Sequence, residues 1–251
     1  MSTENQVFDN LQSLRLTGMN EALKKLLVSP DKSAMPLMDV LALLTGEEIQ
    51  FKAQKKRERL FKAAKLKHNK ACIENIDFLA KRGIDKAYLL TLTSCNWIER
   101  NQFLVITGPT GVGKSWMACA LASEGIKMNF SVLYKRFSLL MEELDIARKD
   151  GSLPTLRSHL AKFILLILDD WAMAPLTAKG RQDLIELIED RIETGSLLFT
   201  SQLPVSQWHE YIGEPTLADA IMDRIVHRSH RLELYGESMR KAYNCVKGRT
   251  S

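Results

Sequence analysis

The spacing of apolar residues divides the 251-residue chain into two regions. Up to about residue 70, apolar residues recur at the spacing of amphipathic helices. A long helix is predicted from Pro36, after a break at Ser29-Pro30-Asp31. The helix predicted before this break runs through Leu11, Leu14, Leu16, Met19, Leu23, Leu26 and Leu27. We therefore expect a small all-helical domain at residues 1–70.

From residue 71 onward, short apolar runs alternate with helical segments. An unbroken apolar run such as Phe163–Leu168 is typical of a strand buried on both faces. The alternation predicts βαβ units and a parallel sheet whose ligand site lies at the carboxyl ends of the strands. The predicted strands are Phe103–Thr107, Phe130–Tyr134, Phe163–Leu168, Leu197–Ser201 and Arg231–Leu234. Residues 71–251 are thus expected to form one α/β domain.

A glycine-rich loop follows the first predicted strand directly. Its glycines allow backbone N–H groups to turn towards phosphate oxygens, and the positive end of the helix predicted at Trp116–Glu124 faces the same phosphates. Lys114 can reach the β- and γ-phosphates, and the Ser115 hydroxyl can ligate Mg²⁺. The loop predicts a binding site for a nucleoside triphosphate. Its residues are Gly108, Pro109, Thr110, Gly111, Val112, Gly113, Lys114 and Ser115, with Trp116 immediately after them.

A pair of carboxylates ends the predicted strand Phe163–Leu168. An Asp pair after a strand is by itself more often a turn or a helix cap than a catalytic site. In a chain that also has Lys114 and Ser115, Asp169 is expected to hold Mg²⁺ and Asp170 to polarise the attacking water. The expected cofactors are therefore ATP and Mg²⁺, since no Asn-Lys-x-Asp motif for guanine follows the loop.

The net charge of +5 is concentrated in one segment, where Glu58 is the only acid among nine bases. Such a stripe can neutralise the phosphates of duplex DNA without reading bases, although a solvated helix face is the usual role of a charge run. The expected DNA-binding residues are Lys52, Lys55, Lys56, Arg57, Arg59, Lys62, Lys65 and Lys67, and Lys70 ends the run.

Hydropathy and cysteine spacing exclude several other classes. No apolar stretch is long enough for a membrane span, and the polar N-terminus is not a secretory signal, so the cytoplasm is expected. The four cysteines are scattered without the spacing of a metal site or a redox pair.

Several motifs in order along the chain resemble those of the IstB-type ATP-binding helper proteins of insertion sequences. This family is related to the DnaC-type helicase loaders and the DnaA initiators within the AAA+ class. The motifs are Gly108 to Ser115, the run ending in Asp169-Asp170, Thr200-Ser201-Gln202-Leu203-Pro204, Asp223-Arg224 and Gly236-Glu237-Ser238-Met239-Arg240. The resemblance implies a P-loop AAA+ domain with three α/β/α layers at residues 71–251.

The resemblance also implies roles for individual residues. Gln202 matches the sensor-1 position, where an amide orients water, and Arg240 matches the sensor-2 arginine that acts on the γ-phosphate of its own subunit. Arg224 matches the arginine finger that completes a neighbouring subunit's site. Asp170 departs from the usual Glu and implies slow turnover, while Trp116 replaces a polar residue and is expected to pack.

The expected function is that of an ATPase that assembles with itself on duplex DNA and assists a transposase in target selection and transposition. A replicative helicase loader of the DnaC type is the alternative, although the basic stripe is unlike an apolar helicase-binding helix. A small-molecule kinase would explain neither the basic stripe nor Arg224.

Overall fold

The computed structural model describes residues 2–28, 35–76, 78 and 82–239. It contains two compact units, Met1–Arg59 and Leu60–Ser251. The division therefore comes earlier in the chain than the boundary expected at residue 70.

The first unit contains α1 (Thr3–Ser13), α2 (Thr17–Val28) and most of α3 (Leu37–Ala64). The prediction of one helix from Leu11 to Leu27 is wrong, because the chain turns at Arg15, whose φ is +56°. The carboxylate of Glu48, on α3, accepts a hydrogen bond of 3.0 Å from the Met19 N–H and so caps the start of α2. The break expected at Ser29-Pro30-Asp31 lies outside the described residues.

The long helix predicted from Pro36 is confirmed as α3, which has 28 residues. It ends at Ala64, and Lys65 turns the chain with a φ of +51°. The basic helix is therefore shorter than the basic segment. Lys65, Lys67 and Lys70 follow it in irregular structure.

The second unit is built on the parallel sheet that the apolar runs predict. The strands are in the order β2-β3-β4-β1-β5, and every neighbouring pair is parallel. Their bounds lie within two residues of most predicted ones: β1 (Phe103–Thr107), β2 (Val132–Arg136), β3 (Leu165–Trp171), β4 (Ser196–Ser201) and β5 (Ser229–Glu233).

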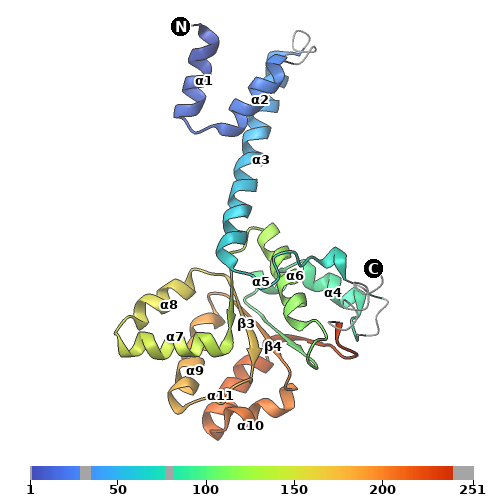
Figure 1. The fold of residues 1–251 in the computed structure, drawn as a ribbon, viewed down its shortest axis with the longest axis vertical. Helices are drawn as coiled ribbons and strands as arrows, with labels where there is room; N and C mark the ends of the chain where they lie inside the picture. Colours follow the sequence, from blue (N-terminus) through green and yellow to red (C-terminus); the bar gives the residue numbers. More distant parts are fainter. Residues whose placement is uncertain (1, 29–34, 77, 79–81, 240–251) are drawn as a thin grey trace, which may run out of the picture. The chain divides into compact units, whose positions relative to one another are not determined.

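Helices connect these strands and cover both faces of the sheet (Figure 1). The helical segments on one face are η2 (Ile73–Asn75), α4 (Lys86–Thr93), α5 (Asn96–Glu99) and α6 (Lys114–Lys127). Those on the other are α7 (Phe137–Lys149), α8 (Leu153–Ala161), α9 (Ala178–Ile192), η3 (Val205–Gln207), α10 (Trp208–Ile212) and α11 (Pro215–Val226).

The alternation of side chains along each strand builds two apolar cores. On β1, Leu104 and Ile106 pack with α4 and α6, while Phe103 and Val105 pack with α9 and α11. Because both of its faces are buried, β3 is apolar without interruption from Leu165 to Leu168. The parallel arrangement brings the carboxyl ends of β1, β4 and β3 to one edge, where the glycine loop, Gln202 and the Asp pair lie.

Candidate nucleotide and magnesium site

The glycine loop joins β1 to α6 and is folded closely against the end of the α/β unit. A Cβ atom on Gly108 would lie 2.0 Å from the carbonyl oxygen of Leu234, and one on Gly111 would lie 2.1 Å from the Ser238 hydroxyl. Both glycines have positive φ angles, of 145° and 84°. Any side chain would therefore disrupt the packing of this loop against residues that follow β5.

The first residues of α6 supply the cationic and hydroxyl groups of the site. The helix begins after Gly113, and no described side chain caps its N-terminus, so its first N–H groups point towards the loop. The ammonium of Lys114 donates to the Gly108 and Pro109 carbonyl oxygens, at 2.7 and 2.9 Å. These bonds hold the lysine across the loop, where phosphate oxygens would lie in a P-loop site.

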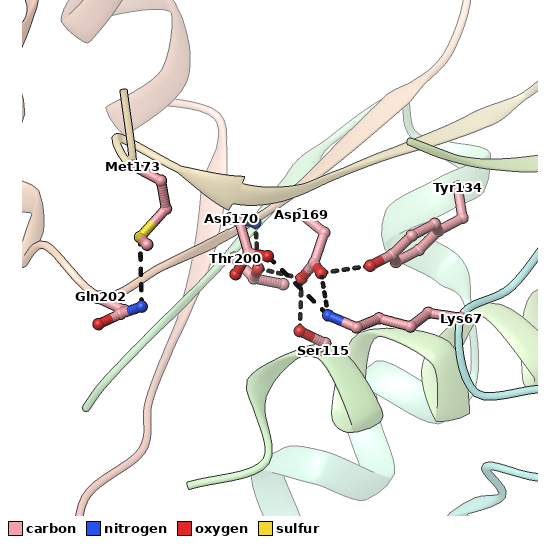
Figure 2. Close-up of polar contacts among 8 residues, drawn as sticks. All are labelled: Lys67, Ser115, Tyr134, Asp169, Asp170, Met173, Thr200 and Gln202. Carbon is pink, nitrogen blue, oxygen red and sulfur yellow. Dashed lines mark hydrogen bonds and ion pairs between the residues drawn. The ribbon is translucent and has the colours of Figure 1, made fainter. Parts of the chain in front are cut away.

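Asp169 is fully buried and is the centre of the polar network in Figure 2. Its Oδ1 accepts hydrogen bonds from the hydroxyls of Ser115, at 2.7 Å, and Thr200, at 2.5 Å. Its Oδ2 accepts from the Tyr134 hydroxyl and from the Lys67 ammonium, the latter at 3.1 Å. Burial alone raises the pKa of Asp169, but these hydrogen bonds and the charge of Lys67 bring it below its ordinary value.

Asp170 lies in a β-bulge, so its side chain does not take the position that regular alternation along β3 would give it. Leu166 and Leu168 face the core beside α7 and α9, and regular alternation would place Asp170 there as well. Trp171 takes that place instead, the register with β4 shifts between Leu168 and Trp171, and Asp170 has a φ of +60°. Its carboxylate is thereby 3.9 Å from the Lys67 ammonium, and the bulge brings both acids to the same side.

Gln202 follows β4 and contacts the glycine loop. Its side-chain oxygen accepts a hydrogen bond of 2.5 Å from the Thr110 hydroxyl, and its amide nitrogen lies 3.2 Å from the sulfur of Met173. The amide predicted to orient water thus touches the loop predicted to bind phosphate. Trp116, also assigned to this site from the sequence, packs against the core beside α4 and α6.

Of the two arginines expected to act on the γ-phosphate, one lies within the described residues. Arg224, on α11, is paired with Glu189 at 2.7 Å and also donates to the Ala220 carbonyl oxygen at 3.0 Å. Arg240 lies outside the described residues. The residue before it, Met239, donates its N–H to the Gly111 carbonyl oxygen at 3.0 Å and so contacts the glycine loop.

Sequence reasoning did not identify two side chains of this network. Tyr134 and Thr200 are both almost completely buried, and each is on a strand that neighbours β3: Tyr134 is in the middle of β2 and Thr200 near the carboxyl end of β4. The signal that could have identified them is a polar side chain near the carboxyl end of a predicted strand of the parallel sheet. Arg82 was also missed: it is buried, and one of its terminal nitrogens would lie 3.5 Å from a Cβ atom on Gly113.

The donor set at Asp169 fits a magnesium ion. Mg²⁺ in nucleotide sites is held by one or two carboxylates or hydroxyls together with phosphate oxygens and water. The hydrogen bond from Ser115 to Asp169 brings such a hydroxyl and such a carboxylate together at the start of α6. These residues would hold Mg²⁺, with the remaining positions left for phosphate and water.

The basic residues of α3 form a separate surface. Lys52, Lys55, Lys56 and Arg59 share one face at helical spacing, and all are exposed. Lys52 pairs with Glu48 at 3.3 Å, and Lys55 pairs with Glu58 at 3.1 Å. Within the described part of the chain, no acid lies at ion-pair distance from Lys56, Arg57, Arg59 or Lys62. These bases are available to an anionic partner, whereas the ammonium of Lys67 is held at the Asp pair.

Comparison with known proteins decides the family. The sequence pattern of the family described as "IstB-like ATP binding protein" matches residues 9–245. The chain belongs to the IstB-like ATP-binding proteins. It is 43% identical over 233 residues to y4pL of Sinorhizobium fredii, which is named as an insertion-sequence ATP-binding protein; the match covers 93% of this chain and 95% of that one.

Solved structures share the fold of this IstB-like protein. DnaI is similar with a TM-score of 0.57 and 21% identity, over 70% of this chain and 93% of DnaI. The DnaC helicase loader is similar with a TM-score of 0.55 and 18% identity, over 65% of this chain and 96% of DnaC. At these identities the likeness shows the fold alone. None of the described helices has the length and hydrophobicity that crossing a membrane requires.

Proposed function

We propose that this IstB-like protein is an ATPase that assembles with itself on duplex DNA and assists a transposase in target selection and transposition. The observation that carries the proposal is the hydrogen bond of 2.7 Å between Ser115 and Asp169, which joins the P-loop to the Asp pair. The insertion-sequence name of its relative y4pL supports the transposition context.

In the proposed reaction the chain's own residues orient the phosphates and the attacking water. Lys114 and the first N–H groups of α6 bind the phosphates, and bound Mg²⁺ would neutralise charge on the phosphate oxygens. Asp170 accepts a proton from the water, and the amide of Gln202, which is hydrogen-bonded to Thr110 of the loop, orients that water. Asp169 stays ionised because its hydrogen bonds hold its pKa low, so it is suited to a metal ligand rather than a base.

Arg224 is the residue we assign to the contact between protomers. Its pairing with Glu189 is on the surface, because the arginine side chain is 31% exposed and the glutamate side chain 49% exposed. A pair of this kind contributes little stability and can be exchanged for another anion. We propose that Arg224 exchanges Glu189 for the γ-phosphate of a neighbouring protomer, so that ATP favours assembly.

The basic face of α3 is the surface we assign to duplex DNA. Each protomer supplies few phosphate contacts, but an assembly repeats them along the duplex and so converts weak contacts into tight binding. Phosphate contacts carry little base information, so target preference on this scheme comes from DNA shape and deformability.

The test is size-resolved DNA binding with ATP and with ADP, on duplex and on single-stranded DNA. The natural chain is compared with Arg224→Ala and with Arg228→Ala as the matched control, since Arg228 is exposed and its side chain donates to the Ile192 carbonyl oxygen. We expect large assemblies on duplex with ATP, their loss in Arg224→Ala, and a fall in ATP hydrolysis of about a hundredfold or more. Assembly that ignores nucleotide would contradict the proposal, and a preference for single strands would favour a helicase loader.

A further inference from the structure

Lys67 is the member of the basic segment that the DNA-binding proposal does not explain. It lies three residues beyond the end of α3 at Ala64. Its ammonium is 3.1 Å from Asp169 Oδ2 and 3.9 Å from Asp170 Oδ2, and its side chain is only 28% exposed. Figure 2 shows it reaching the Asp pair beside Tyr134. A cation from outside the known motifs therefore neutralises the carboxylates predicted to hold Mg²⁺ and to activate water.

The carboxylate of Asp169 has no acceptor position left for a further ligand. Each of its oxygens already accepts two hydrogen bonds. Ser115, Thr200 and Tyr134 donate from α6, β4 and β2, elements fixed in the two cores. Lys67 donates from a connecting segment through a long flexible stem. Of the four donors, it is the one that can leave without disturbing the sheet or α6.

The position of Lys67 is determined by the packing on both sides of it. Ala64 before it and Ala71 after it are buried in the core beside α6, and Leu66 packs against the same core. The Ser123 hydroxyl, on α6, donates to the Ala71 carbonyl oxygen at 3.1 Å. The backbone that carries Lys67 is thus held against the helix that begins with the P-loop lysine. Its contact with Asp169 is a built feature of the site.

We propose that Lys67 is a built-in competitor of Mg²⁺ at the Asp169 carboxylate: it holds the Asp pair when no metal nucleotide is bound, and Mg²⁺ entering with nucleotide displaces it. The inference rests on the proposed role of Asp169 as the magnesium ligand. Two cations cannot share one buried carboxylate oxygen, because their like charges repel at such distances. Lys67 therefore sets the Mg²⁺ concentration at which nucleotide binds.

The test measures binding of fluorescent ADP as Mg²⁺ is titrated, so that turnover does not enter. We compare the natural chain with Lys67→Met, which keeps an apolar stem of similar length, and with Lys67→Arg, which keeps the charge. Lys70→Met is the matched control, since Lys70 is an exposed lysine of the same segment. In Lys67→Met we expect the half-saturating Mg²⁺ concentration to fall roughly tenfold, as expected when one charge-assisted hydrogen bond is removed. Lys67→Arg and Lys70→Met should stay within about twofold of the natural chain.

Stability without the metal gives a second readout. In EDTA, the melting temperature of Lys67→Met should fall by several degrees because the buried carboxylate of Asp169 loses its cationic partner, and Mg²⁺ with ADP should reduce that difference. An unchanged Mg²⁺ requirement in Lys67→Met overturns the proposal. So does a higher requirement, which would mean that Lys67 binds phosphate instead.

Labelling of lysines in the natural chain tests the same idea without a variant. An acylating reagent should modify Lys67 slowly in EDTA and faster with Mg²⁺ and ADP, as measured by mass spectrometry. The labelling rate of Lys70 should be the same in both conditions. Slower labelling of Lys67 with the metal nucleotide would refute displacement. If nucleotide binding by Asp169→Asn has the same Mg²⁺ dependence as binding by the natural chain, Asp169 is not the magnesium ligand. The proposed function then fails at that residue, and the role of Lys67 fails with it.

Discussion

The backbone conformation at Asp170 gives a physical reason for the residue found there. A left-handed φ of +60° is costly for most side chains, but Asp and Asn adopt it more readily because their short polar groups can hydrogen-bond locally. The Asp170 N–H donates to the Thr200 hydroxyl at 3.1 Å, which fixes the bulge. Aspartate in place of the usual glutamate is therefore matched to the bulge that directs this carboxylate.

This conformation predicts that Asp170→Glu does not restore fast hydrolysis. We expect the variant to lose roughly 1 kcal/mol of unfolding free energy, because the longer side chain is less tolerant of positive φ. Asp170→Asn should keep stability and lose ATP hydrolysis. Denaturant unfolding and ATP turnover measure the two effects, with the exposed helical Asp39→Glu as control. Faster turnover in Asp170→Glu at unchanged stability would contradict this account.

Two buried thiols predict a pH dependence. Burial raises the pKa of Cys95 and of Cys119 from 9.0 to about 11. Because the folded chain holds these protons more tightly than the unfolded chain, their contribution to stability is complete below about pH 9 and is lost as pH rises through about 11. The unfolding free energy should therefore fall over this range, and less steeply in Cys119→Ala.

The same burial predicts which thiols react. At about pH 8, alkylation followed by peptide mass spectrometry should modify the half-buried Cys72 well before Cys95 or Cys119. Unfolding in denaturant should remove the difference. Rapid labelling of Cys119 in the folded chain would show that the core beneath the nucleotide site is open.

At the scale of elements, one buried arginine joins three segments at the amino edge of the sheet. Arg191, on α9, is 1% exposed and has four hydrogen bonds to backbone carbonyl oxygens. Two go to Leu160 and Phe163, at and just beyond the end of α8, one to Ile164 before β3, and one to Ser196 in β4. Burial lowers its pKa to about 10, which still leaves it charged at neutral pH. Arg191 thus fixes the ends of α8, β3 and β4 together.

Replacing this arginine should therefore be far more damaging than replacing an exposed one. Arg191→Met removes all four of these hydrogen bonds, and we expect a loss of roughly 3 kcal/mol or more of unfolding free energy. The matched variant is Arg157→Met, which removes surface ion pairs with Asp190 and Glu186 and should cost about 1 kcal/mol or less. Denaturant unfolding measures the unfolding free energy of both variants. Equal losses would mean that the contacts of Arg191 with the carbonyl oxygens contribute little.

The elements were predictable where their pattern is local. Mainly apolar runs located β1 to β4, and a run of alternating charged and apolar residues located β5. The glycine loop located the start of α6. The break between α1 and α2 was missed because Leu14-Arg15-Leu16 contains no glycine or proline. The turn is stabilised from a distance, by Glu48 capping α2, and such a contact leaves no local signal.

The site was predictable in its motifs and not in the side chains between them. A run of charges does not reveal which lysine turns inward, so Lys67 was assigned with its neighbours to DNA. The bulge at Asp170 arises because Trp171 takes the core position on β3, which depends on packing against Phe137, Phe199 and Trp208. Tertiary packing of this kind cannot be inferred from spacing along one strand.

At the scale of the whole molecule, DNA binding through α3 predicts a defined response to salt. Removing one phosphate-binding side chain lowers the slope of log affinity against log salt concentration by about 1. Lys56→Gln and Arg59→Gln should each produce this change on duplexes of unrelated sequence. Lys162→Gln, an exposed lysine of the α/β unit, should not. Unchanged slopes in the α3 variants would remove this helix from the DNA interface.

The strand order also determines when, during synthesis, a nucleotide site can exist. β1 carries the glycine loop, yet its partners are β4 and β5, which the ribosome makes only after β2 and β3. Until Ser201 has emerged, β1 is an apolar strand with both edges open, and until Leu234 has emerged, Gly108 lacks the carbonyl against which it packs. A nascent chain interrupted before Ser196 therefore cannot bind ATP and exposes a strand prone to aggregation.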